Sequence, residues 1–217
     1  MEEKTFVDDI NRSVYDIKNE EKDAYRIKQG LTPEIVEKIS EEKHDPAWMR
    51  EFRLKSLEIY NNMQVPDWGP SIDGLNMDNI ATYVRANTNM KGDWKDVPEE
   101  IKDTFDRLGI PKAERESLAG VGAQYDSELV YHNVRKEVAD QGVVYTDMES
   151  ALTGEYADMV HEHFMKLITP QDHKFAALHG AVWSGGSFVY VPKGVKLDIP
   201  LQSYFRLNSP ESGQFEH

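Results

Sequence analysis

The sequence predicts an α+β fold, with a mainly helical N-terminal domain over residues 1–174 and a strand-rich segment over residues 175–217. Apolar residues recur at three- and four-residue intervals in much of the first part, which is the spacing of one helix face. Leu201–Asn208 instead alternates strictly, and a period of two indicates a strand. Residues 175–217 hold three basic and three acidic side chains, so the whole net charge of −14 lies upstream.

Capping residues mark the start of two helices in the first third of the chain. Thr32 is a favourable N-cap and Pro33 suits the first helical turn, so a short helix is expected from there. Asp45-Pro46 repeats the arrangement and begins a longer amphipathic helix that should end before Pro66. The residues expected to face inward are Ile35, Val36 and Ile39 in the first helix, and Trp48, Met49, Phe52, Ser56, Leu57, Tyr60 and Met63 in the second.

A long connection and two further helices are expected next. Residues 65–96 contain repeated Pro and Gly with little regular pattern, so they are predicted to form a connection with a short strand near Ile80–Val84. Pro98 opens the following helix and Gly109 closes it, with Ile101, Phe105 and Leu108 facing inward. Another short helix is expected over Pro111–Ala119.

The middle of the chain is predicted to alternate between helix and strand. Asp126-Ser127 is expected to cap a helix that runs to about Ala139, and Val143–Tyr145 is a predicted strand. Asp147 should begin another helical section, which continues as an amphipathic helix over Glu155–Ile168.

Two strands are predicted in the last part. Ser187–Val191 is a short apolar and aromatic run bounded by turn residues, Gly185-Gly186 before it and Pro192-Lys193-Gly194 after it. The second strand, Leu201–Asn208, should have one packed face and one polar face. The packed face is expected to hold Leu201, Ser203, Phe205 and Leu207, and the polar face Gln202, Tyr204, Arg206 and Asn208.

Composition excludes several classes of protein. A sequence pI near 4.9 argues against a nucleic-acid-binding surface, which needs clustered Lys and Arg. No apolar run approaches the ~20 residues of a membrane span, and no secretory signal begins the chain, so the cytoplasm is the expected location. The chain has no cysteine, which rules out disulfides and thiolate metal ligands within it.

Four motifs could indicate catalysis or metal binding, and each has a simpler explanation. His161-Glu-His163 lacks the i, i+4 spacing of a zinc helix, so ordinary helix histidines are expected. Gly120-Val-Gly122 lacks the third glycine of a dinucleotide site and is interpreted as a turn, as is Gly185-Gly186-Ser187, which has no base linked by spacing. The acidic pairs Asp8-Asp9, Glu20-Glu21 and Glu41-Glu42 are interpreted as solvated surface.

The polar strand face is the one set of residues that we carry forward as a candidate site. Gln202, Tyr204, Arg206 and Asn208 lie on one face at two-residue spacing. A solvent-facing strand would show the same alternation, so a bland surface stays an alternative. The functional alternative is a polar lining of a binding site, or a subunit contact, with Arg206 holding an anionic group.

Five linked blocks carry a resemblance to a known family: Leu118–Glu128, Phe175–Leu178, Ala181–Val195, Ser203–Asn208 and Gly213–Glu216. In this order they resemble SufB, the scaffold subunit of the SUF iron–sulfur cluster assembly complex, in which the polar face would line a path for cluster or sulfur transfer. The similarity extends upstream to about Leu31 and so covers most of the chain. The Tyr-Phe-Arg-x-Asn pattern at 204–208 is shared with SufB-like sequences, which strengthens the functional interpretation of the polar face.

The resemblance implies a fold and a function. The strands after residue 175 would open a right-handed parallel β-helix, and the chain would be a C-terminally truncated member, because relatives continue past His217 into further coils. The intact family member is a scaffold and not an enzyme. It receives sulfur and iron, builds a nascent iron–sulfur cluster and passes it on. Its partners are an ABC-type ATPase subunit, a paralogous β-helix subunit and a sulfur donor protein, and the ATPase activity belongs to a partner. No cluster is expected on this cysteine-free chain.

Two alternatives stay open at this point. One is a non-catalytic docking or structural β-helix subunit of the same complex, and the other is a β-helix enzyme acting on carbohydrate or acyl groups. The sequence also departs from the family pattern, since His179-Gly180 stands where many relatives have Asn-Ser, and Asp198 where some have Cys. The first departure puts a role for that turn in doubt, and the second removes a nearby thiol.

Overall fold

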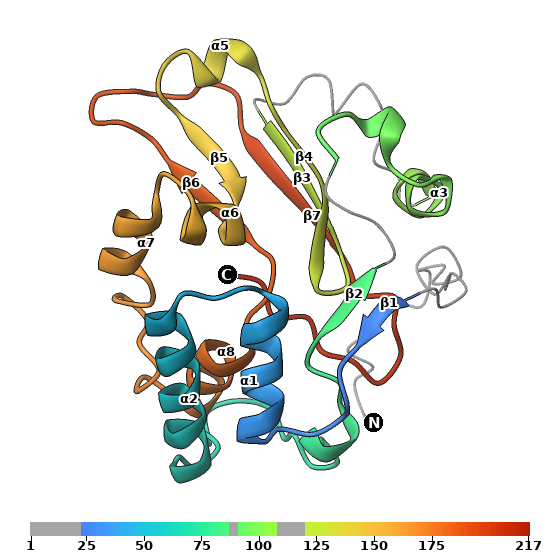
Figure 1. Ribbon diagram of the computed structural model, residues 1–217, viewed down its shortest axis with the longest axis vertical. Coiled ribbons are helices and arrows are strands. Elements are labelled where there is room, and N and C mark those ends of the chain that lie inside the picture. Colours follow the sequence, from blue (N-terminus) through green and yellow to red (C-terminus); the bar gives the residue numbers. More distant parts are fainter. Residues whose placement is uncertain (1–22, 87–90, 108–119) are drawn as a thin grey trace, which may run out of the picture.

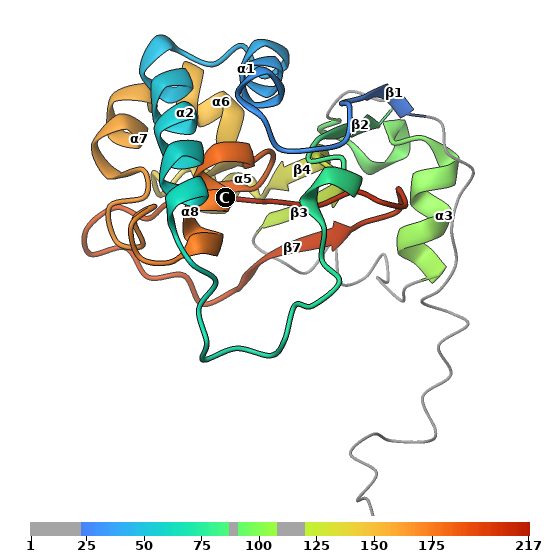
Figure 2. The ribbon, with the colours of Figure 1, turned by 90° about the horizontal axis from the view of Figure 1, so that it is seen from below.

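The computed structural model describes residues 23–86, 91–107 and 120–217. Figure 1 shows helices gathered on one side of the molecule and a three-stranded sheet on the other, with a second small sheet above the helices. The α+β prediction is therefore confirmed for the described residues. Figure 2, seen from below, shows one further helix beyond the three-stranded sheet, on the side away from the helical group.

Three helices form the centre of the helical group: α1 (Pro33–Glu42), α2 (Ala47–Asn62) and α8 (Lys174–Val182). The capping prediction for α1 is confirmed, because the Thr32 side chain accepts the Ile35 N–H. Helix α8 was not predicted, since its segment was assigned to the strand-rich part. Its alanine-rich sequence has no polar stripe because it is almost wholly buried against α2. The shared core consists of Ile35, Val36, Ile39, Leu57, Leu178, Ala181 and Val182.

The three-stranded sheet has the order β4-β3-β7, with β3 (Gly120–Tyr125), β4 (Glu128–Val134) and β7 (Leu201–Arg206). Strand β3 runs antiparallel to β4 and parallel to β7. The predicted turn at 120–122 is wrong, because these glycines lie within β3, where Tyr145 packs too closely for a side chain at either position.

The predicted helix from Asp126-Ser127 to Ala139 is also wrong. These two residues form the hairpin turn between β3 and β4, with Asp126 in the left-handed region at φ 52°. The segment that follows pairs as β4 and buries Val130 and Tyr131, residue types that favour strands. Only α5 (Lys136–Ala139) is helical.

A two-stranded antiparallel sheet joins β5 (Val144–Asp147) to β6 (Ser187–Tyr190), and both strands were predicted. Asp147 caps α6 (Met148–Thr153), as expected. Helix α7 covers only Ala157–His163, so the prediction of a helix over residues 155–168 is too long. The backbone turns at Met165, at φ 46°, and leaves Leu167 fully exposed instead of packed.

The remaining elements flank the three-stranded sheet. Strand β1 (Asp23–Arg26) pairs antiparallel with β2 (Val84–Ala86), so the strand expected near residues 80–84 begins only at the last of them. Helix α3 (Glu99–Arg107) buries Ile101 and Phe105 as predicted. Short 3-10 helices cover Met77–Asn79 and Trp94–Asp96. The predicted helix over 111–119, the position of Gly109 and most of the first 29 residues lie outside the described residues.

The proposed boundary near residue 174 stays a prediction. Within the described residues, the two parts share structural elements, since β7 pairs with β3 and α8 packs against α2. The core beside α3 brings both parts together as well, because Tyr204 packs against residues of β3 and β4 there.

Candidate functional site

The four polar residues predicted as a site share β7 and the loop just after it. Gln202, Tyr204 and Arg206 lie opposite alternate residues of β3, and Asn208 follows two residues beyond the strand. Tyr204 packs against the core beside α3, and Asn208 is only 6% exposed. The interpretation of this row as solvated surface is therefore wrong for these two residues.

The face that was predicted to be packed is in fact exposed at its far end. Leu201 packs against a small core and the Ser203 hydroxyl lies 2.5 Å from the Tyr145 hydroxyl of β5. Further along the same face, Phe205 is 47% exposed and Leu207 is 42% exposed. Alternation was correctly predicted, but the assignment of inside and outside fails because β5 covers only the first part of this face.

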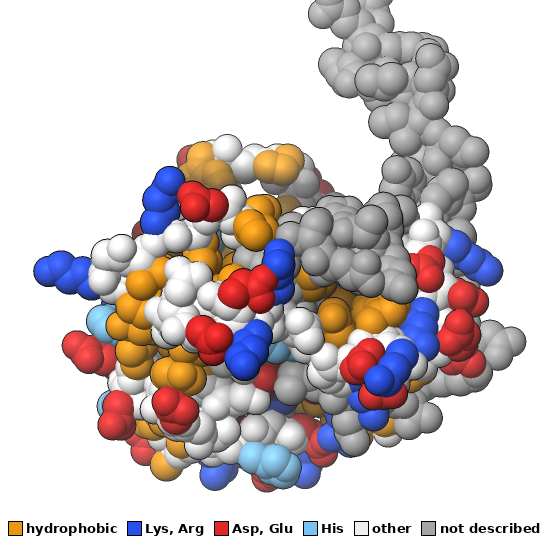
Figure 3. All heavy atoms as spheres, turned by 90° about the horizontal axis from the view of Figure 1, so that it is seen from above, with side chains coloured by type: hydrophobic (Ala, Val, Ile, Leu, Met, Phe, Trp, Pro, Cys, Tyr) orange, Lys and Arg blue, Asp and Glu red, His pale blue; other side chains and the backbone are white. Residues whose placement is uncertain are grey.

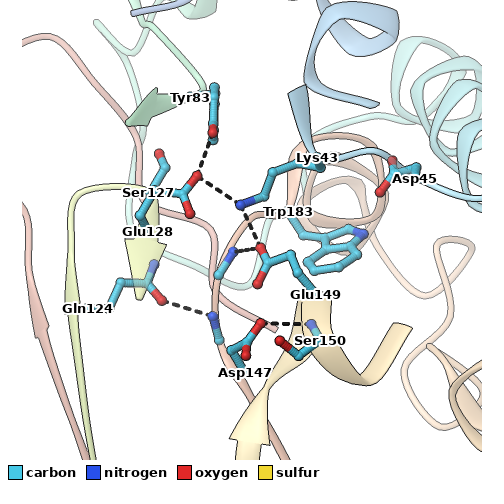
Figure 4. Close-up of polar contacts among 12 residues, drawn as sticks. Lys43, Asp45, Tyr83, Gln124, Ser127, Glu128, Asp147, Glu149, Ser150 and Trp183 are labelled. Atoms are coloured by element: carbon cyan, nitrogen blue, oxygen red, sulfur yellow. Dashed lines mark hydrogen bonds and ion pairs between the residues drawn. The ribbon is translucent and has the colours of Figure 1, made fainter. Parts of the chain in front are cut away.

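The turn between β3 and β4 connects three parts of the fold. The Asp126 carboxylate accepts two backbone N–H groups from the loop after β7. The Ser127 hydroxyl accepts the Val84 N–H of β2 at 2.9 Å. Glu128 accepts the Tyr83 hydroxyl at 2.5 Å. Three consecutive side chains thus join the loop after β7, the start of β2 and Tyr83 around one hairpin, and Figure 4 shows the last of these contacts, between Glu128 and Tyr83.

Lys43, at the end of α1, links this turn to α6. Its Nζ lies 2.9 Å from Glu128 Oε1 and 2.7 Å from Glu149 Oε1 (Figure 4), and its side chain is 4% exposed. Burial alone would lower the pKa of Lys43, but the two carboxylates raise that pKa above its ordinary value. Burial likewise opposes ionisation of Glu149, and the Lys43 charge together with hydrogen bonds holds the pKa of Glu149 below its ordinary value.

The Gly185-Gly186 loop is held by side chains and does not present free amides. The Gly185 N–H donates to Glu149 Oε1 at 2.6 Å, and the Gly186 N–H donates to Gln124 Oε1 at 2.8 Å. Figure 4 shows both acceptors pointing into this loop. Both glycines have positive φ, as a turn requires. An oxyanion or phosphate site in this loop is therefore disfavoured, because the donors are already used.

The imidazole side chains of His179 and His217 lie next to each other. His179 Nε2 lies 2.8 Å from His217 Nδ1. Burial, with the nearby Arg53 charge, lowers the pKa of His179 to about 4, and burial with its neighbour lowers the pKa of His217 to about 4. His217 also lines an open pocket of about 420 Å³ between α7 and β6 whose walls are mostly Met, Val and Phe side chains. The imidazole pair is neutral at neutral pH.

The other motifs from the sequence occupy ordinary structural positions. The His161 ring packs at a tilt of 47° against Trp48, with ring centroids 4.5 Å apart, while His163 lies at the pocket beside β6. Glu41 pairs with Lys38 on the surface. Asp8-Asp9 and Glu20-Glu21 lie outside the described residues. Among residues 23–86, 91–107 and 120–217, no three His, Asp or Glu side chains are grouped as metal ligands.

The network around Lys43 was missed from the sequence. A Lys within Glu41-Glu-Lys-His44 has the appearance of solvated surface, and nothing local marks it as buried. The run Tyr125–Glu128 between two buried strands is the signal that could have indicated a hairpin turn, since Asp and Ser are turn residues.

Figure 3 shows how charged side chains are distributed over one face of the described residues. On the face in Figure 3, basic side chains are scattered among acidic ones and do not form a single patch. Among the helices that the structure describes, none combines the length and the apolar character needed to cross a bilayer.

The chain is an α+β module. A group of helices lies beside a small sheet in which β3 and β7 pair in parallel. The sequence model described as SufBD protein N-terminal region matches residues 35–203, and the chain belongs to this family. It is 53% identical over 208 residues to the iron-sulfur cluster assembly protein SufB of Bacillus subtilis, covering 96% of this chain and 44% of that protein.

Two further relatives are also iron-sulfur cluster assembly proteins by name. An iron-sulfur cluster assembly SufBD family protein of Staphylococcus haemolyticus is 50% identical over 208 residues, and one of Staphylococcus aureus is 49% identical, each covering 96% of this chain. The chain spans less than half the length of these relatives, 44% in each case.

Proposed function

We propose that the chain is the N-terminal portion of an iron–sulfur cluster assembly scaffold of the SUF system, whose last strands begin a right-handed parallel β-helix. The observation that carries this proposal is the parallel pairing of β3 with β7 over six residues. Parallel strands in one sheet are joined by crossovers that are nearly always right-handed, and stacked coils of a β-helix are built from such pairs.

The C-terminal residues support the same fold. The His217 N–H donates to the Gly185 carbonyl at 3.4 Å, and the Ser187 N–H donates to the His217 carbonyl at 2.9 Å. These two bonds flank Gly186 in the pattern of a parallel pair. A side chain at Gly186 would overlap the His217 backbone, which explains a glycine at this position. We propose that residues 215–217 start a strand that stacks on β6.

The polar row is the part of the chain that we propose to take part in cluster assembly. Arg206 carries a planar fork of donors that suits an anionic sulfur species or a carboxylate ligand. Gln202 and Tyr204 supply neutral polar groups on the same strand, and Asn208 supplies another in the loop just after it. The iron–sulfur cluster is cargo in this proposal. This chain has no thiolate to hold it, so its ligands would come from outside these 217 residues.

The proposed setting is the cytoplasm, in a complex with an ABC-type ATPase subunit, a paralogous β-helix subunit and a sulfur donor protein. ATP hydrolysis belongs to the partner, and the chain itself is not an enzyme. A second role, as a non-catalytic docking subunit of the same complex, is favoured by exposed Phe205 and Leu207, which are suited to a subunit contact.

Anaerobic reconstitution with ferrous iron and sulfide tests the proposal. The two samples are the chain alone and a chimera in which the chain is followed by the remainder of Bacillus subtilis SufB, with native Bacillus subtilis SufB as the folding control. We expect the visible absorption of a cluster on the chimera and none on the chain alone. A stable, stoichiometric cluster on the chain alone, or none on a folded chimera, would contradict the proposal.

A further inference from the structure

We infer that Asp126 is a positioning residue that holds Arg206 and Asn208 in the geometry used for cluster assembly, an inference that rests on the function proposed above. Asp126 lies in the hairpin turn on the neighbouring strand pair, 80 residues upstream of Arg206 in the sequence. It does not belong to the polar row. Its role would be to fix the chain where the row ends.

The carboxylate of Asp126 accepts three hydrogen bonds from the loop after β7. Its Oδ1 accepts the Asn208 N–H at 2.7 Å and the Ser209 N–H at 2.9 Å, and its Oδ2 accepts the Ser209 hydroxyl at 3.0 Å. Asp126 is 1% exposed, and Asn208 and Ser209 are also buried. A buried carboxylate that accepts these donors holds them firmly, because losing it would leave the two backbone N–H groups unsatisfied.

The backbone of Asp126 also forms hydrogen bonds with the end of β7 and with nearby side chains. Its N–H donates to the Arg206 carbonyl at 2.8 Å, and its carbonyl accepts the side-chain amides of Gln124 and Gln214 at 3.1 and 2.7 Å. One residue therefore contacts the backbone of Arg206, Asn208 and the loop that follows. Because buried backbone groups require partners, these bonds hold the main chain at the two residues from which the row's last side chains project.

The backbone conformation explains why Asp suits this position. Asp126 has φ 52°, in the left-handed region that Asn and Asp tolerate better than other residues with side chains. Asn would keep both this conformation and an Oδ1 acceptor for the two N–H groups. Its Nδ2 could donate to the Ser209 hydroxyl, which can turn its own proton toward Asp23 Oδ1, now 3.3 Å away. Gly would keep the conformation and remove the acceptors.

The experiment compares Asp126→Gly and Asp126→Asn with Ser127→Ala. Ser127 is the next residue in the same turn and equally buried, but its hydroxyl holds Val84 and not the loop after β7. The first readout is amide hydrogen exchange of the 217-residue chain. Exchange at Asn208 and Ser209 should accelerate in Asp126→Gly and stay unchanged in Asp126→Asn and Ser127→Ala.

The second readout is the rate of cluster assembly per folded molecule in the chimera with Bacillus subtilis SufB. Asp126→Gly should slow assembly by roughly ten- to a hundredfold, because small misplacements of positioned groups have effects of that size. Asp126→Asn should restore the rate. The double variant Asp126→Gly/Arg206→Ala should be no slower than Arg206→Ala, since one residue acts through the other.

Two results would overturn the inference, and they are distinguishable. If Asp126→Gly and Ser127→Ala slow assembly equally, Asp126 supports only the fold. If Arg206→Ala assembles clusters at the unaltered rate, the proposed function of the row fails, whatever the exchange data show for Asp126.

Discussion

The Arg53 guanidinium and the Asp45 carboxylate form an ion pair in the core, with Nε 2.6 Å from Oδ2 and neither side chain exposed. Arg53 also donates through Nη1 to the Trp183 carbonyl at 2.8 Å, and its guanidinium lies 4.6 Å from the centre of the Trp183 ring. The pair therefore joins the loop before α2, α2 itself and the end of α8.

Breaking this pair should be strongly destabilising. Arg53→Ala leaves the Asp45 carboxylate buried without its cation, which typically costs about 3–5 kcal/mol of unfolding free energy. Arg50→Ala is the matched control on the same helix, because Arg50 pairs with Glu37 on the surface and its removal should change the unfolding free energy little. Urea denaturation measures the unfolding free energy of both variants. Similar decreases in the two would show that the buried pair stabilises the fold no more than the surface pair does.

His179 should make the chain less stable in mild acid. The pKa of His179 lies near 4 in the folded chain and near 6.5 when unfolded, so between these values the unfolded state binds a proton that the folded state does not. Stability is then lost as the pH falls from about 6.5 towards 4.

His179→Asn should flatten this part of the stability curve, and His217 should keep a residual slope, since its pKa is lowered too. The measurement is the urea midpoint at intervals from pH 7 to pH 4, with His161→Asn as the exposed control. An unchanged slope in His179→Asn would mean that another group titrates in this window.

Glu149 should affect the stability of the fold at a lower pH than His179 does. Its folded pKa lies below the ordinary 4.5, so the stability it contributes is present above that value and is lost as the pH falls through the folded pKa. Glu149→Gln should cost about 1–3 kcal/mol at pH 7, because Lys43 and the Gly185 N–H lose a charged acceptor. It should also flatten the stability curve below pH 4.5. Glu99→Gln is the control, because this carboxylate pairs with Lys102 but is 78% exposed, and an equal loss from both would refute a special role for Glu149.

Gly186 tests the proposed stacking of residues 215–217 on β6. Gly186 and Gly194 both have positive φ, 99° and 84°, but only Gly186 faces another backbone, while Gly194 faces open space. Gly194→Ala should cost about 1–2 kcal/mol from the backbone alone. Gly186→Ala should cost about another 1–3 kcal/mol from overpacking. Equal losses in urea denaturation would mean that residues 215–217 do not pack on this strand in solution.

Sequence reasoning identified the elements that local signals determine. Thr32 and Asp147 were predicted to cap helices from their side-chain chemistry, and both do. Alternation also placed the strand β7, which ends at Arg206, two residues before the predicted end. These predictions succeed because helix caps and the two-residue period of a strand depend on neighbours within a few residues.

The errors occur where distant residues decide the structure. Asp126-Ser127 has the chemistry of a helix cap as well as of a turn, and the pairing of β3 with β7 selects the turn. Phe205 was expected inside, but which face of β7 is covered depends on β5 and the core beside α3. Lys43 is buried because Glu128 and Glu149, far away in sequence, surround it. No local pattern carries that information.

The most direct test of the proposed role of the polar row is cluster assembly by the chimera carrying Arg206→Ala, compared with Lys196→Ala. Lys196 is the control because it pairs with Asp198 in an exposed turn where both side chains are more than four-fifths solvent-accessible. Losing a charge-assisted hydrogen bond from Arg206 costs roughly 1.5–3 kcal/mol, or about ten- to a hundredfold in the equilibrium it controls. We predict that Arg206→Ala impairs assembly by that factor at an unchanged melting temperature, while Lys196→Ala assembles clusters normally. Equal assembly by both variants would contradict the account.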